Sequence, residues 1–153
     1  MSLSGGRARA WRLALALCGV VVAVDQGTKA AIEANLVPGE RVSVLPGLHL
    51  TDVHNEGIAF GLAGGGGAGL VALTAIALAL ILMLFARHAE RPGVWISVGI
   101  LTGGALGNLA DRVRIDSVTD WVDLPLWPAF NLADVAIVLG VAGLALSFME
   151  HAD

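Results

Sequence analysis

The sequence contains few charged residues and a single cysteine. Charged side chains make up 14% of the 153 residues, while 56% are hydrophobic and the mean hydropathy is +0.78. Soluble domains carry about a quarter charged residues, so this composition excludes an ordinary soluble domain. Cys18 alone can form no internal disulfide, and no Cys/His cluster has the spacing of metal ligands.

Several hydrolase motifs are also missing from the sequence. It has no serine nucleophile elbow, no HExxH zinc motif and no phosphate-binding loop. We therefore expect no metal, no cofactor and no nucleic-acid partner. No segment has the composition of a linker, so residues 1–153 are predicted to form one membrane-embedded domain.

Four apolar stretches predict an all-α integral membrane protein. The expected spans are, approximately, residues 11–31, 68–86, 94–110 and 132–149. The clearest, 68–86, has no charge and suits a bilayer core of roughly 30 Å. The first must continue past Asp25 to reach this length. It also resembles a cleaved signal peptide, but no small-x-small cleavage site follows it, so we expect it to be retained.

The basic residues predict the orientation of these spans. Arg7, Arg9 and Arg12 precede the first span, and Arg87 and Arg91 lie in the short link between the second and third. Because cytoplasmic loops are enriched in Lys and Arg, both termini are expected in the cytoplasm. The outer side then holds residues 32–67 and 111–131.

A small extracytoplasmic β-rich segment is expected between the first two spans. Residues 41–45 and 48–53 show partial alternation and flank Pro46-Gly47, a turn signal. In the third span Gly99, Gly103 and Gly107 recur every four residues, a small-xxx-small ridge on which another helix can pack.

Polar residues gather at the outer ends of the predicted spans. Ionisable groups at membrane depth cost a few kcal/mol each and therefore tend to mark a functional site. With the orientation above, the following residues lie on one side of the bilayer: Asp25, Lys29, Asn55, Asn108, Asp111, Arg112, Asp120, Asn131 and Asp134.

Simpler explanations exist for some of these residues. Asp25 and Lys29 are four apart and could form only a helical ion pair. Asn131 and Asp134 have the spacing of a helix cap and a first-turn acid. Asp120 is harder to explain in this way, because it lies between spans, in what we expect to be an irregular, proline-bounded loop. Asp123 is either a solvated neighbour or a competitor for the role of Asp120.

Two carboxylates held close together can hydrolyse a peptide bond without a metal or cofactor. They titrate as a pair, so that one acts as a base toward water and the other as an acid. The alternative is a small proton- or ion-coupled transporter, in which Asp25, Asp120 and Asp134 carry the ions. Relay carboxylates should be spread through the depth of the membrane, whereas these cluster on one side.

Five segments together resemble the motifs of the lipoprotein signal peptidases (signal peptidase II), in the family's order and over nearly the whole chain. They are Asp25-Gln26-Gly27-Thr28-Lys29, Asn55-Glu56-Gly57-Ile58-Ala59-Phe60, residues 103–112 (GGALGNLADR), Val118-Thr119-Asp120-Trp121 and residues 128–134 (PAFNLAD). The departures are small. Trp121 replaces a commoner Phe, and Glu56 adds a charge where small polar residues are usual.

The resemblance implies four spans, an active site near the outer leaflet of the bacterial inner membrane, and cleavage before a diacylglyceryl-modified cysteine of prolipoproteins. It implies that Asp120 and Asp134 are the catalytic aspartates and that the cyclic peptide globomycin is an inhibitor. Membrane lipids are expected partners, and the protein is expected to be a monomer. Substrate-binding or supporting roles would fall to Asp25, Lys29, Asn55, Gly104, Asn108, Arg112 and Asn131.

The sequence only weakly separates the two aspartates. A position in the first turn of a helix favours the charged form of Asp134, because the helix dipole is positive there. Asp120 is then the better candidate for the protonated partner.

Overall fold

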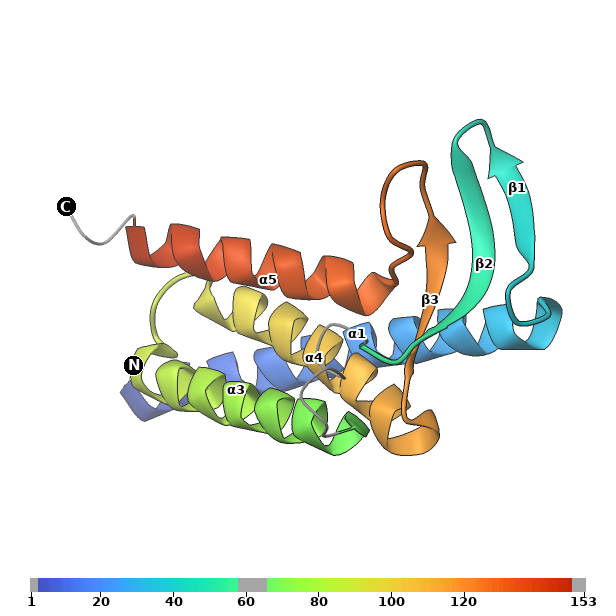
Figure 1. Ribbon diagram of the computed structural model, residues 1–153. Coiled ribbons are helices and arrows are strands. Elements are labelled where there is room, and N and C mark those ends of the chain that lie inside the picture. Colours follow the sequence, from blue (N-terminus) through green and yellow to red (C-terminus); the bar gives the residue numbers. More distant parts are fainter. Residues whose placement is uncertain (1–2, 58–65, 150–153) are drawn as a thin grey trace.

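The computed structural model describes residues 3–57 and 66–149. Its elements are α1 (Leu3–Asn35), β1 (Arg41–Leu45), β2 (Leu48–Asn55), α3 (Gly66–His88), α4 (Val94–Ile115), β3 (Val118–Asp123) and α5 (Leu132–Met149). The helices lie side by side, with the strands at one end, and the start of α1 and the end of α5 lie at the other (Figure 1). The chain is thus mostly helical, with a small antiparallel sheet.

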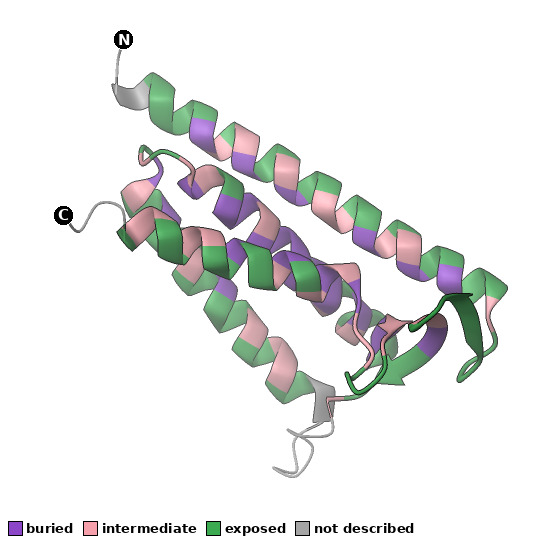
Figure 2. Ribbon diagram, turned by 90° about the horizontal axis from the view of Figure 1, so that it is seen from above, coloured by how far each residue is buried: buried purple, intermediate pink, exposed green. Residues whose placement is uncertain are grey.

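Three of the described helices are long and apolar enough to cross a membrane. They comprise Gly5–Asn35, Ala68–His88 and Leu132–Met149. The third expected span, 94–110, lies in α4, which is not among them and carries several polar residues in its second half. It packs against α1, α3 and α5 and is therefore the central helix. Figure 2 shows its buried residues between helices whose outer faces are largely exposed.

Glycines allow α4 to approach both α1 and α5 closely. A Cβ added at Gly103 would lie 2.6 Å from Val21 Cβ of α1, and one added at Gly104 would lie 2.5 Å from the carbonyl oxygen of Ala133 in α5. Gly99 similarly contacts Ala14 of α1. The predicted helix packing on the glycine ridge is therefore confirmed.

The predicted hairpin is also confirmed, and a third strand extends it. β1 and β2 are antiparallel around Gly47, whose φ of 80° lies in the left-handed region that glycine tolerates. β3 pairs antiparallel with the other edge of β2, giving the order β1-β2-β3. The sheet thus draws one strand from the α4–α5 connection as well as two from the segment after α1.

The expectation that Asp120 lies in an irregular loop is wrong. Asp120 belongs to β3 and is opposite Val53 of β2. On the other side of β3, the backbone groups of Val122 exchange hydrogen bonds with those of Phe130, at 2.8 and 3.0 Å. The two prolines of this region, Pro125 and Pro128, lie beyond the strand, where they interrupt no ladder bond. The strand that carries Asp120 is therefore held by backbone pairing on both sides.

Candidate active site

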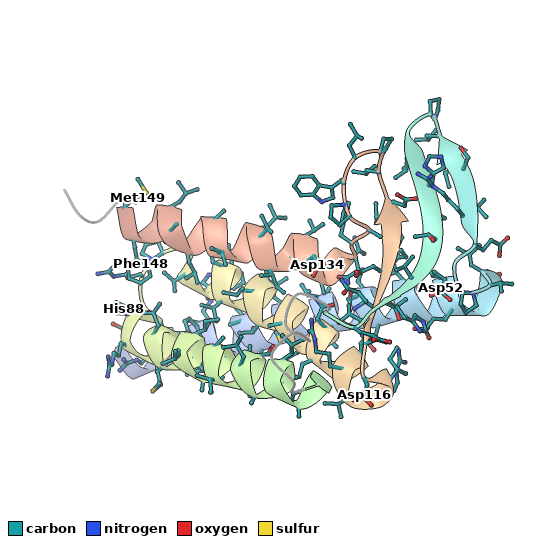
Figure 3. All side chains as sticks on the ribbon, in the orientation of Figure 1. Asp52, His88, Asp116, Asp134, Phe148 and Met149 are labelled. Atoms are coloured by element: carbon teal, nitrogen blue, oxygen red, sulfur yellow. The ribbon has the colours of Figure 1, made fainter. Side chains whose placement is uncertain are left out.

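Asp134 lies in the first turn of α5, at the end of the helix nearest the sheet (Figure 3). Asn131 caps this helix, because its Oδ1 accepts a hydrogen bond from the Asp134 backbone N–H at 3.0 Å. In return, the Asn131 backbone N–H donates to Asp134 Oδ2 at 3.2 Å. Asn108 Nδ2 of α4 donates to Asp134 Oδ1 at 2.8 Å. The predicted helix start is confirmed, and both oxygens of Asp134 accept a hydrogen bond.

Asp120 extends from β3 of the sheet toward the start of α5, where Asp134 lies. Its side chain is buried, with a relative exposure of 2% for the residue. Its Oδ2 accepts from Asn55 Nδ2 at 2.9 Å, and its Oδ1 accepts from Asn131 Nδ2 at 2.7 Å. Asn131 therefore donates to both aspartates, from its side chain to Asp120 and from its backbone to Asp134.

The surroundings of Asp120 shift its acidity toward neutral pH. Burial raises the pKa of Asp120 to about 6, and the negative charge of Asp134 acts in the same direction, while the hydrogen bond from Asn55 opposes them. A carboxyl group with this pKa exchanges its proton readily between pH 5 and 7. Asp134 is thus close enough for its charge to influence the acidity of Asp120, and the two carboxyl groups form a pair. Such a pair can supply one acid and one base at the same time.

The buried cation Lys29 is linked to Asp134 through Asn108. Lys29 Nζ lies 2.8 Å from Asp25 Oδ2 and 2.7 Å from Asp111 Oδ2, and all three side chains are completely buried. It also donates to Asn108 Oδ1 at 2.9 Å. Because Lys29 occupies the oxygen of this amide, the Asn108 nitrogen is left to face Asp134.

Asp25 links α1 to the start of α5. Its Oδ2 pairs with Lys29 within the helix, which confirms the predicted ion pair. Its Oδ1 accepts the backbone N–H of Ala133 at 3.0 Å. This N–H belongs to the first turn of α5 and has no acceptor within the helix. Asp25 therefore positions the turn that carries Asp134, beyond forming a local ion pair.

Two of the expected site residues, Gly104 and Arg112, form no hydrogen bond or ion pair with the side chains of the others among the described residues. Gly104 lies against Ala133 and Ala136, so it sets the distance between α4 and α5. Arg112 Nη1 donates to the carbonyl oxygen of Asn108 at 3.4 Å, so this hydrogen bond stays within α4. The other expected site residues are joined in one network of hydrogen bonds and ion pairs.

Two residues of this network were given no role from the sequence. Asp111 supplies the second carboxylate of Lys29. Gln26 Nε2 lies 2.9 Å from Asp111 Oδ1 and 3.1 Å from the carbonyl oxygen of Gly107, and so joins α1 to α4. The sequence did contain a hint of the role of Asp111. A buried lysine at membrane depth is stabilised only when several partners satisfy its charge, so a second carboxylate near Lys29 could have been expected. Nothing in the sequence distinguishes Gln26 in this way.

Asp123 does not share the position of Asp120. It lies three residues further along β3, on the opposite face of the sheet, and its Oδ2 is 2.5 Å from Arg41 Nε. Residues 58–60 of the second motif lie outside the described residues. Within the described residues, no group of three or more His, Cys, Asp or Glu side chains could hold a metal ion.

Comparison with known proteins gives a consistent picture. A sequence model of the family described as signal peptidase (SPase) II matches residues 17–150. The lipoprotein signal peptidase of Pelotomaculum thermopropionicum is 41% identical over 139 residues, covering 90% of this chain and 91% of that protein. That of Moorella thermoacetica is 44% identical over 130 residues, covering 83% and 86%. A solved structure, described as a bacterial membrane enzyme determined by the in meso method at 1.9 Å resolution, matches with a TM-score of 0.84 and 28% identity, over 90% of this chain and 93% of that one.

Proposed function

The chain belongs to the signal peptidase II family, and from this membership we propose that it cleaves its substrate by an aspartic mechanism with Asp120 and Asp134 as the catalytic pair. It is a protease of the bacterial inner membrane that removes signal peptides from bacterial prolipoproteins. The observation that supports the proposed pair best is the pair of hydrogen bonds by which Asn131 donates to both carboxylates.

The two aspartates divide the chemistry of hydrolysis. Asp134, in the first turn of α5, is the ionised partner and removes a proton from the attacking water. Asp120, with its raised pKa, donates a proton to the carbonyl oxygen as the water oxygen bonds to the carbonyl carbon. Collapse of this gem-diol intermediate breaks the C–N bond before the diacylglyceryl-modified cysteine. The leaving amine takes up the proton held by Asp134, and one hydroxyl of the gem-diol returns its proton to Asp120 as the new carboxyl group forms, so both aspartates regain their starting states.

Other residues of the network hold this pair in place. Asn55 and Asn131 donate to Asp120 and thereby orient its carboxyl group within the sheet. Asn108 does the same for Asp134, while Asp25 and Lys29 fix the start of α5 and the Asn108 amide. Gly104 keeps α4 and α5 close together. Arg112 lies one turn beyond Asn108 and is assigned to the substrate, either to a headgroup phosphate or to a backbone carbonyl.

The site lies on the outer side of the membrane in this proposal. All four long helices span the bilayer, with α4 as the central one, and both termini lie in the cytoplasm beside the basic residues Arg7, Arg9, Arg12, Arg87 and Arg91. The sheet then lies at the outer surface, with the aspartates at the level of the outer leaflet. We further propose that the protein is one domain, acts as a monomer among membrane lipids and is inhibited by globomycin.

The experiment that tests the pair replaces each aspartate separately. Asp120→Asn and Asp134→Asn keep the shape of the side chain but cannot exchange a proton, so each should lower the rate of cleavage of a diacylated precursor by about 100-fold or more. Asp123→Asn is the matched control, because Asp123 is on the same strand but the opposite face. Normal cleavage by either Asn variant, or a loss as large in Asp123→Asn, would exclude the proposed pair.

A further inference from the structure

The two faces of the sheet differ in chemistry. On one face Arg41 Nε of β1 lies 2.5 Å from Asp123 Oδ2 of β3, across the middle strand, and Arg41 Nη2 lies 3.1 Å from Nδ1 of His49 on that middle strand. On the other face Val42 is opposite Leu50, and Leu50 is opposite Val122. Residues opposite one another share a face, so one face is charged and the other is apolar.

The apolar face is the one that carries Asp120. Asp120 and Val122 are two residues apart on β3 and therefore point to the same side of the sheet. Because Asp120 is hydrogen-bonded to Asn131 just before α5, this side faces the outer end of that helix. The charged face consequently points away from α5.

The loop after β3 adds exposed apolar side chains to this side. Leu126 is 105% exposed and Trp127 is 66% exposed. The backbone of Leu126 has a φ of 64°, which directs the chain through a conformation that leucine rarely adopts. A Cβ built at Gly47 lies 4.0 Å from Pro125 Cγ, so the hairpin turn, with its 59% exposed Leu45, adjoins this loop.

The loop is continuous with a helix surface that faces lipid. It lies on the α5 side of the sheet and runs directly into α5 (Figure 1). α5 is apolar enough to cross a membrane, and Val135, Val138 and Leu139 are exposed near its start. Tryptophan is enriched where protein surfaces pass from the acyl region to the headgroups. The same lipid that covers the start of α5 is therefore next to Trp127.

We propose that residues 124–128, together with Leu45 and the apolar face of the sheet, form a lipid-docking surface that enters the outer leaflet. The occupant is phospholipid of the surrounding bilayer, at the boundary between acyl chains and headgroups. Residues 124–128 read Leu-Pro-Leu-Trp-Pro and contain no charge, so the contact depends on apolar burial and not on anionic headgroups. This surface holds β3 at a fixed depth. The consequence for catalysis rests on the proposed role of Asp120, whereas the lipid contact does not.

Lipid contact can be measured through the fluorescence of Trp127. The protein and its Trp127→Phe variant are reconstituted in phosphatidylcholine vesicles whose lipids carry bromine either near the headgroup or near the chain ends. The difference between the two emission signals isolates Trp127 from the other three tryptophans. We expect this difference signal to be quenched more by the bromine near the headgroup, and to resist acrylamide in the aqueous phase. Adding phosphatidylglycerol should leave the quenching unchanged.

Two results would overturn this proposal. One is a difference signal that acrylamide quenches and brominated lipid does not, which would put the loop in water. The other is lipid quenching that requires added precursor, which would make this surface a substrate-binding surface instead. Since no substrate is needed, the outcome is independent of whether Asp120 and Asp134 are catalytic.

A second variant tests the effect on turnover. Leu126→Asp places a charge on the lipid-docking surface, and we expect it to raise KM for a membrane-embedded precursor severalfold while kcat changes little. Val37→Asp is the matched control, because Val37 is 68% exposed but lies between α1 and β1, away from this surface. Equal effects of the two variants would contradict a specific role for residues 124–128.

Discussion

Replacing Lys29 by methionine should show how strongly the buried charges hold the site together. The change keeps much of the side-chain volume but removes the cation that contacts Asp25, Asp111 and Asn108 at 2.7 to 2.9 Å. Asp25 and Asp111 would then remain completely buried without their shared counter-charge. Removing one partner of a buried ion pair typically costs about 3–5 kcal/mol.

Contacts that survive the substitution place the expected loss at the lower end of this range. Asp25 keeps the backbone N–H of Ala133 at 3.0 Å. Asp111 keeps Gln26 at 2.9 Å and a longer contact of 3.4 Å with the half-exposed Arg114. We therefore expect Lys29→Met to lower the free energy of unfolding by about 3 kcal/mol, which for a chain of this size lowers the melting temperature by roughly 6–12 °C.

The assay is thermal unfolding of the detergent-solubilised protein, and a double variant sharpens it. Asp111→Asn alone should destabilise the protein, because it removes a partner of Lys29. In the Lys29→Met background the same change should stabilise it, because it removes an uncompensated buried charge. Arg41→Met is the matched control, since its ion pair with Asp123 is half-exposed and should be worth less than about 1 kcal/mol. Asp111→Asn destabilising both backgrounds equally would refute this reasoning.

Two further predictions concern the aspartates and the helix that carries Asp134. Burial raises the pKa of Asp120 to about 6, and its protonated form is the proposed acid, so kcat/KM should fall up to roughly tenfold per pH unit above pH 6. Asn55→Ala removes a donor to the charged form and should move this fall to higher pH, and an unmoved profile would contradict the assignment. Gly104→Ala would bring a methyl group within 2.5 Å of the Ala133 carbonyl oxygen and should cost about 1–3 kcal/mol of stability, whereas Gly19→Ala, with nothing within 4 Å, should cost none.

The features predicted correctly from the sequence are those whose signals are local. The hairpin around Gly47 was indicated by a Pro-Gly turn between two alternating runs, and the structure has both strands. The start of α5 was indicated by the spacing of Asn131 and Asp134, and the two residues form the expected reciprocal hydrogen bonds. Each signal lies within a few residues and depends little on the rest of the chain.

The features that were missed depend on partners distant in the sequence. β3 was expected to be irregular because prolines follow it closely, and its pairing with β2 could not be seen from Val118–Asp123 alone. Asp111 was recognised as polar and close to the membrane, but its pairing with Lys29 requires α1 and α4 to lie in register. That register is set by the contacts of Gly99 and Gly103 with α1, which fix how closely and at what height the helices meet.

The side chain of Asn131 both caps α5 and donates a hydrogen bond to Asp120. Its Oδ1 is used by the Asp134 backbone N–H at 3.0 Å, so the cap fixes the orientation of the whole amide. The Nδ2 group must then point away from α5, and its two hydrogens reach Asp120 Oδ1 at 2.7 Å and Asn108 Oδ1 at 3.2 Å. From the sequence, a helix cap and a catalytic support were competing explanations of the same spacing. In the structure the cap and the contact with Asp120 occur together, because a capping asparagine still has its amide nitrogen to donate, and the fold places Asp120 there.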